Sequence, residues 1–179
     1  MGSRQNNFER RGSGMKTKAR SVRWAAGAIA AGAAVLLAAT AAGSTGGATV
    51  TRGELTSFAA GAGGTVGGHA QMVRNASGAT IVSLHVTGLT PGGQYASHVH
   101  VAPCDVGDAD GHYKRDPAGP ALPPNEIWPG GAPFVANAAG TANERAVADY
   151  TAGADAVSIV VHDLSLPSTA NKIACADLG

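Results

Sequence analysis

Three of the six histidines in this 179-residue chain lie in one short stretch, "HVHVAPCDVGDADGHY", residues 98 to 113. Side chains alternate along a β-strand, so a strand here would place His98 and His100 on one face, with their Cα atoms about 7 Å apart. Two imidazoles at that spacing can share one metal ion. The pair alone is weak evidence, because a surface histidine pair has the same pattern, and a metal site needs further ligands.

A fourth histidine closes another apolar stretch, "DAVSIVVHD", residues 155 to 163. Alternation places Ile159 and Val161 on one face of this stretch, and Val160 and His162 on the other. A histidine at the end of an apolar strand is more often a core or edge residue than a ligand. His162 becomes a candidate ligand only if another feature brings it close to the histidines near residue 100.

The N-terminal region indicates export. Seven of the thirteen Lys and Arg residues, but only one of the twelve Asp and Glu residues, precede residue 24. An uncharged, alanine-rich block ending in small residues follows, as is typical of a secretory signal peptide. Cleavage of this block, or its retention as a membrane anchor, stays open. We predict three parts: an N-terminal extension plus signal peptide at 1 to 41, a linker at 42 to 48, and one β domain at 49 to 179.

Without its leader the chain is acidic. Six basic and eleven acidic side chains remain, which gives a net charge near −5. No basic patch remains to replace the counterions of a nucleic acid or of an anionic membrane, so we expect neither as a stable partner. Export implies an extracellular, periplasmic or cell-envelope location, and the sequence leaves the oligomeric state open.

In an oxidising compartment the only two cysteines, Cys104 and Cys175, are expected to form one disulfide, with buried free thiols as the alternative. The bridge would close a loop of about 70 residues and stabilise the fold by up to about 4 kcal/mol. Cys104 follows His100 by four residues, and Cys175 follows His162 by thirteen. The disulfide would therefore bring the two histidine-bearing regions together.

The remaining pattern predicts an all-β fold, because short β-branched stretches recur between Gly, Pro and Asn turns and no helical period persists. Eight strands in one domain indicate a Greek-key β-sandwich or flattened barrel. The segment 103 to 132 is long, contains His112, Glu126 and Trp128, and is predicted to be a functional loop. The predicted strands are 49 to 58, 65 to 74, 79 to 87, 94 to 102, 133 to 137, 142 to 150, 156 to 162 and 171 to 178.

The two other histidines are not expected to be metal ligands. In its strand His85 points away from the apolar face formed by Leu84 and Val86, and His69 has no partner nearby in the sequence. The acidic stretch "DVGDADG" also lacks the ligand spacing of a calcium loop, so we interpret it as a charged turn.

Four segments, "GLTPGGQYASHVHVAPC", "GHY", "VSIVVHD" and "NKIACADL", resemble in order and spacing the copper,zinc superoxide dismutase family. The resemblance covers essentially all of the predicted β domain. It implies an Ig-like sandwich and a secreted enzyme that converts superoxide to oxygen and hydrogen peroxide while copper cycles between Cu(II) and Cu(I). It also implies a set of copper ligands: His98, His100, His112 and His162. Tetragonal nitrogen coordination of this kind suits Cu(II).

Other positions match the family in part. The resemblance pairs Cys104 with Cys175 and places Lys172 where the family has an arginine that guides the anion. Between His112 and His162 the chain has no histidine, whereas the family has two zinc-binding histidines and an aspartate there. The resemblance therefore implies a copper-only branch, in which zinc is not expected.

A carboxylate is predicted to replace zinc as the group that orients His112. Glu126 is the first choice and Asp116 the second, since a metal-bound imidazole needs an acceptor for its other ring nitrogen. The alternative function is a non-enzymatic copper-binding or structural module on the same fold. The missing zinc ligands and the lysine at position 172 support that alternative.

Overall fold

The computed structural model describes residues 46–58 and 66–179. The described residues all belong to one compact unit, Gly43–Gly179. The predicted signal peptide and the first residues of the predicted linker lie outside the described residues. In the described ranges, no helix has the length and apolar character needed to cross a membrane.

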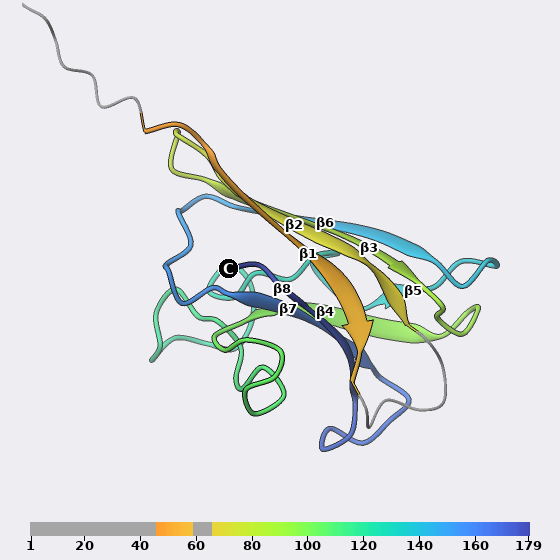
Figure 1. The fold of residues 1–179 in the computed structure, drawn as a ribbon. Coiled ribbons are helices and arrows are strands. Elements are labelled where there is room, and N and C mark those ends of the chain that lie inside the picture. The colour runs from red at the N-terminus through yellow and green to blue at the C-terminus, as the bar shows by residue number, and fades with distance from the viewer. Residues whose placement is uncertain (1–45, 59–65) are drawn as a thin grey trace, which may run out of the picture. The chain divides into compact units, whose positions relative to one another are not determined.

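Eight antiparallel strands form the domain, and each begins and ends within two residues of its predicted bounds. The fifth strand is the shortest, because Pro133 has no N–H for a ladder and the N–H of Asn137 already donates to Thr141 in a turn. The strands are β1 Thr49–Ser57, β2 Gly67–Arg74, β3 Thr80–Thr87, β4 Gln94–His100, β5 Phe134–Val135, β6 Ala142–Ala148, β7 Ser158–Asp163 and β8 Lys172–Asp177 (Figure 1).

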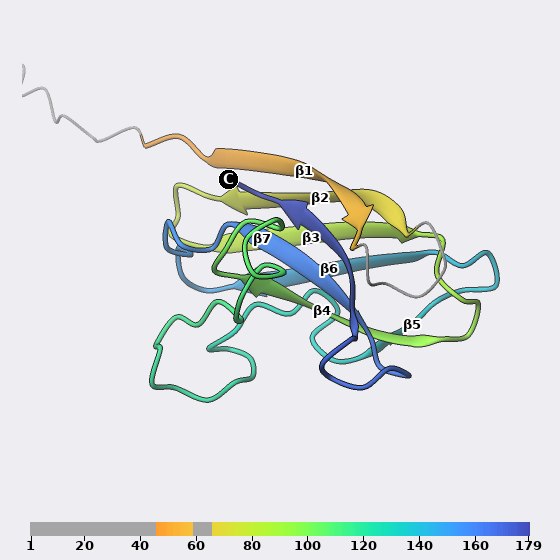
Figure 2. The same cartoon turned by 60° about the horizontal axis from the view of Figure 1, so that its bottom comes forward.

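The strands follow the order β5-β4-β7-β8-β1-β2-β3-β6 and form two layers that face each other, as Figure 2 shows from a second side. Strand β1 joins the layers, pairing with β2 over most of its length and with β8 only through Thr56 and Ser57. Strand β4 lies beside β7, and β3 lies beside β6, so connections cross between the layers in Greek-key fashion. The predicted all-β sandwich or flattened barrel is confirmed.

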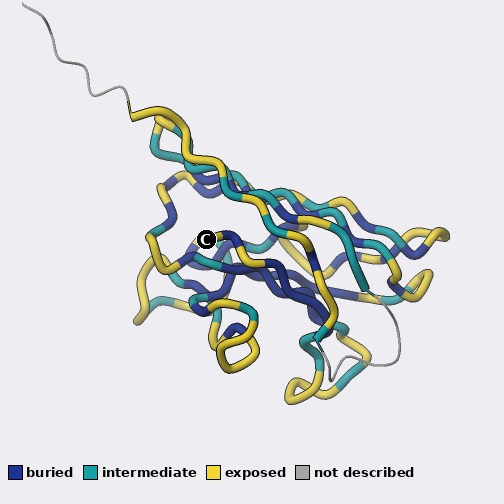
Figure 3. Tube along the Cα trace, viewed as in Figure 1, coloured by how far each residue is buried: buried dark blue, intermediate teal, exposed yellow. Residues whose placement is uncertain are grey.

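Burial differs between the two layers (Figure 3). Along β3, buried and half-buried residues alternate, so only one face of that strand is covered. In β4 six of seven residues are buried, and in β7 five of six, so this layer is covered on both faces. One face packs on the main core, and Ala109, Val160 and Cys175 form a smaller apolar cluster on the other. That second covered face carries the histidines.

Candidate metal centre

Strands β4 and β7 position three of the four histidines. Val99 belongs to the main core, so His98 and His100, on either side of it, point to the opposite face. In the β4–β7 ladder His98 faces Val160, two residues before His162, which places His162 in the neighbouring register position on the same face. The strand pairing therefore places His98, His100 and His162 on one face of this layer.

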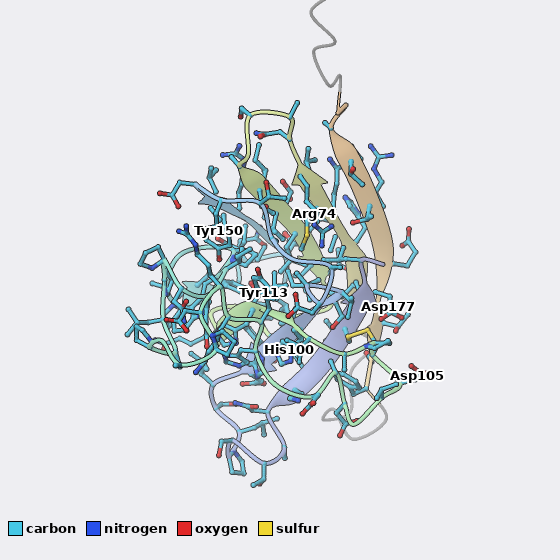
Figure 4. All side chains as sticks on the ribbon, turned by 90° about the vertical axis from the view of Figure 1, so that its left-hand side faces the viewer. Arg74, His100, Asp105, Tyr113, Tyr150 and Asp177 are labelled. Carbon is cyan, nitrogen blue, oxygen red and sulfur yellow. A yellow bond between two sulfur atoms is a disulfide. The ribbon has the colours of Figure 1, made fainter. Side chains whose placement is uncertain are left out.

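The fourth histidine comes from the long loop. His112 forms an isolated bridge with His100, where the N–H of Val101 donates to Gly111 and the N–H of Tyr113 donates to Val99. The loop therefore extends the ladder of β4 at this point and holds His112 beside the two histidines of the strand. Figure 4 shows the environment of His100 and Tyr113 with all described side chains.

The four imidazoles converge. One ring nitrogen of each histidine lies within 4.8 Å of those of the other three. His98 is 4.1 Å from His112 and 4.7 Å from His162 between ring centroids, while His100 is 4.9 Å and 5.6 Å from the same two rings. The remaining distances, 6.5 Å from His98 to His100 and 5.8 Å from His112 to His162, are the longest. The rings thus stand at the corners of a four-sided figure that can hold one metal ion.

Three ring nitrogens are candidate ligand atoms. Nδ1 of His98, Nε2 of His100 and Nε2 of His162 are buried and have no hydrogen-bond partner among the described residues. Burying a polar atom without a partner costs free energy, so each of these atoms is suited to a ligand that the protein alone does not supply. The residues present therefore fit a metal ion with nitrogen ligands.

The other ring nitrogens of His100 and His162 have acceptors that fix their tautomers. Nδ1 of His100 lies 3.3 Å and 3.1 Å from the carbonyl oxygens of Ala109 and Asp110. A carbonyl only accepts, so Nδ1 carries the proton and Nε2 keeps its lone pair. Nδ1 of His162 contacts Oδ1 of Asn171 at 3.1 Å in the same way. Such partners orient imidazoles for metal binding.

Burial keeps the strand histidines neutral in the metal-free protein. Desolvation, followed by repulsion from His112 and His162, lowers the pKa of His98 to about 2. The same causes, with a contribution from Lys172, lower the pKa of His100 to about 3. Desolvation also lowers the pKa of His162 to about 4, although its bond to Asn171 opposes the shift. Neutral imidazoles are the form that binds a metal.

Glu126, rather than Asp116, contacts the loop histidine. Its Oε2 lies 2.9 Å from Nδ1 of His112 and also accepts a 2.7 Å hydrogen bond from Nε1 of Trp128. Asp116 uses Oδ1 to accept from the N–H of Ala118 in its own turn. The structure therefore places Glu126, the first choice, at His112, and not Asp116.

A buried asparagine shapes the loop that carries Glu126. The side chain of Asn125 accepts from the N–H of Asp116 and donates to the carbonyls of Asp116 and Pro120. The carbonyl of Ile127 then accepts from Val99 of β4. These bonds close the loop on itself and fasten its end to the strand that carries His98 and His100, which fixes the position of the Glu126 carboxylate.

The disulfide joins the site to the C-terminal strand. Cys104 and Cys175 are bridged, and the backbone N–H of Cys104 donates to Oδ1 of Asp177, near which Figure 4 shows the yellow sulfur–sulfur bond. The expected pairing of the two cysteines is present. Because Cys175 is opposite Val160 of β7, the bridge fastens the loop after His100 to the layer that carries His162.

Lys172 lies beside the histidine cluster and contacts the loop directly. It helps to line a hollow of about 380 Å³ that the four histidines also line. Its Nζ donates to the carbonyl oxygens of Asp108 and Asp110 at 2.7 Å each. The ammonium group of Lys172 therefore holds the loop through these hydrogen bonds and also lies beside the four histidines.

Sequence reasoning missed two groups around the site. The ring of Trp128 lies 4.6 Å from that of His98 between centroids, in addition to its bond to Glu126. Asn171 orients His162 from the end of a short loop. Both residues lie within two positions of a predicted functional residue, Trp128 after Glu126 and Asn171 before Lys172, and that proximity was the available clue.

Neither protein-family models nor curated proteins provide a match for this chain. The eight-stranded fold, the four-histidine cluster and the disulfide are compatible with a superoxide dismutase-like protein. The geometry of the site is therefore the basis for any statement about function.

Proposed function

We propose that this chain is an exported copper-dependent superoxide dismutase. The observation that carries the proposal is the set of three buried, partnerless ring nitrogens that converge with a fourth imidazole from the loop. A structural histidine cluster would satisfy these atoms with hydrogen bonds. The disulfide supports an oxidising compartment and therefore export.

The donor set favours copper. Four imidazole nitrogens suit the tetragonal preference of Cu(II), and the order of divalent-metal affinities places copper above zinc at a site of this kind. His98, through Nδ1, and His100 and His162, through Nε2, would hold the ion together with His112. When bound, copper supplies the reversible one-electron chemistry by which two superoxide anions and two protons become oxygen and hydrogen peroxide.

His112 is suited to handle one of those protons. Its side chain is 30% exposed, whereas His100 is fully buried, so solvent reaches the loop histidine. With Nδ1–H held by Glu126, its Nε2 is the nitrogen that can accept a proton and return it to a reduced oxygen species. The carboxylate next to it stabilises the imidazolium that results.

The same contact supports a site that works without zinc. In a two-metal site a second ion would hold Nδ1 of His112, but here Glu126 lies within hydrogen-bonding distance of that nitrogen and Trp128 donates to the same oxygen. Zinc prefers four nitrogen, sulfur or oxygen ligands. In the described ranges, the four histidines make up the only group of three or more metal-ligating side chains that lie close together. We therefore assign Glu126 the orienting role.

Lys172 is the proposed guide for the anion. The domain is acidic, so its overall field opposes the approach of superoxide unless a local cation attracts it. The ammonium of Lys172 lines the same hollow as the histidines. Lysine is a point charge without the planar fork of arginine, which makes it the less specific of the two groups.

The deciding experiment is reconstitution with both metals, followed by metal analysis and a superoxide assay on the same sample. We expect one equivalent of copper, a tetragonal Cu(II) spectrum in electron paramagnetic resonance, and turnover. At one equivalent of copper, His100→Ala should abolish that spectrum, while the matched control His85→Ala should keep it. Copper binding without turnover would favour the non-enzymatic module, and a tightly bound, required zinc would overturn the copper-only assignment.

A further inference from the structure

A second pair of histidines lies on the outer face of the opposite layer. His69 of β2 and His85 of β3 are directly opposed in the ladder, and their ring centroids are 5.2 Å apart. His69 is exposed and His85 is half-buried. Both lie on the face of the β1–β2–β3–β6 layer that points away from the core, so this pair is separate from the four-histidine centre.

We propose that His69 and His85 form a surface binding site for a divalent transition-metal ion with imidazole preference, Zn(II) or Cu(II). Side chains directly opposed on neighbouring strands have Cβ atoms about 5 Å apart, a spacing that allows two imidazoles to bind one ion. Water completes the coordination, so the site exchanges its ion more readily than the buried centre. This proposal does not rest on the proposed dismutase function.

The tautomer of His85 is set for metal binding. Its Nδ1 lies 2.8 Å from Oδ1 of Asn143, the residue directly opposite on β6. An amide oxygen only accepts, so Nδ1 carries the proton and Nε2 keeps a lone pair for the ion. This is the arrangement that orients metal-bound histidines in proteins.

The backbone beside His69 brings the two strands together. Gly68 has φ +135°, and a Cβ at that position would collide with the carbonyl oxygen of His85. Only glycine allows this approach without strain. Gly68 therefore allows strand β2 to lie this close to His85.

Charged neighbours tune the site in opposite directions. Glu54 of β1 is directly opposite His69, so an anionic side chain extends the row Glu54, His69, His85, Asn143 across four strands. Arg145 lines the same hollow of about 310 Å³ as the two histidines and repels a cation. Both charges are exposed, so salt screens their effects.

The test is a Zn(II) titration of the full chain followed by nuclear magnetic resonance of the histidine side chains. We expect the His69 and His85 resonances to shift together in one step that fits a single ion at this pair, apart from any changes at the four buried histidines. His69→Ala should weaken the response of His85 at least roughly tenfold, and His85→Ala should do the same to His69, because each variant leaves a single imidazole. An unchanged amide spectrum elsewhere shows that each variant is folded.

Two charge variants and one control sharpen the result. Glu54→Gln should weaken Zn(II) binding at this pair, and Arg145→Gln should strengthen it, with both effects shrinking at high salt. His100→Ala should leave this titration unchanged, so failure of the buried centre is distinguishable from failure of the surface site. The proposal is overturned if Zn(II) shifts neither histidine, or if His85 responds equally in the presence and absence of His69.

Discussion

Nδ1 of His112 lies 2.9 Å from Oε2 of Glu126, a residue that is only 2% exposed. The other carboxylate oxygen, Oε1, is buried without a partner among the described residues. Burying a carboxylate costs free energy unless an interaction with another group compensates its charge. The contact with His112 is the compensating interaction that the geometry indicates.

Glu126→Gln should keep copper and lose turnover. The four imidazoles remain, but the amide carries no charge to stabilise a protonated His112, and loss of such a partner typically lowers affinity or activity by about 10- to 100-fold. Copper content and the rate of superoxide consumption, measured on one preparation, separate the two effects. Asp116→Asn is the matched control and should behave like the wild type. Full activity of Glu126→Gln would remove the carboxylate from the mechanism.

Lys172→Glu should lower activity more than Lys172→Arg. At low salt we expect a difference of roughly tenfold or more, since a cation near the site raises the encounter rate with an anion. Raising the salt concentration should shrink the difference by screening. Lys172→Gln removes the cation that donates to Asp108 and Asp110 without adding an anion, so it shows how much of the loss in Lys172→Glu comes from the introduced negative charge. Equal activities of the Glu and Arg variants at low salt would show that steering does not involve this position.

Replacing both cysteines by serine should destabilise the domain by about 2–5 kcal/mol, the usual cost of removing a native disulfide. The bridge spans 71 residues and holds the loop after His100 against β8, so copper affinity should fall as well. Urea unfolding and a copper competition assay measure the two effects. Asp177→Asn weakens only the bond to the N–H of Cys104 and should cost much less. Equal urea midpoints for the wild type and the double variant would contradict this account.

The strands could be predicted because the evidence for them is local. Alternation in "TIVSLHVT" and the short β-branched run in "SIVVHD", with turn residues between the strands, locate these strands without knowledge of their neighbours. The same alternation placed His98 and His100 on one face. Bringing His162 to them required a long-range constraint, and the expected disulfide supplied one.

Contacts that depend on loop conformation could not be predicted from the sequence. The choice between Glu126 and Asp116 is decided by the side chain of Asn125, which holds the loop closed. Lys172 reaches its carbonyls because Asp108 and Asp110 have positive φ, a conformation that non-glycine residues adopt rarely. Strand register also matters, since a shift of one residue would move a histidine of the outer pair to the core face.

The metal-free protein should lose stability as the pH falls below 6.5. Burial lowers the pKa values of His98, His100 and His162 to about 2, 3 and 4, so these side chains stay neutral in the folded state while they protonate in the unfolded state. Between about pH 6 and pH 4 the unfolded state therefore binds up to three more protons, and the free energy of unfolding rises with pH by at most about 4 kcal/mol per unit. The contribution of these histidines to the free energy of unfolding is fully present above pH 6.5, the pKa of a histidine in the unfolded state. It falls as the pH is lowered, until the histidines of the folded state also protonate.

Urea unfolding of the metal-free protein at several pH values between 7.5 and 4.5 measures this slope. Carboxylates also titrate at the acidic end, so the informative quantity is the difference between the wild type and His162→Gln. This variant keeps a hydrogen-bonding side chain but removes one of the three buried imidazoles, and it should therefore lower the slope near pH 5 by about one proton, roughly 1.4 kcal/mol per unit. Identical slopes for the two proteins would mean that His162 is not held neutral by its burial beside the other histidines.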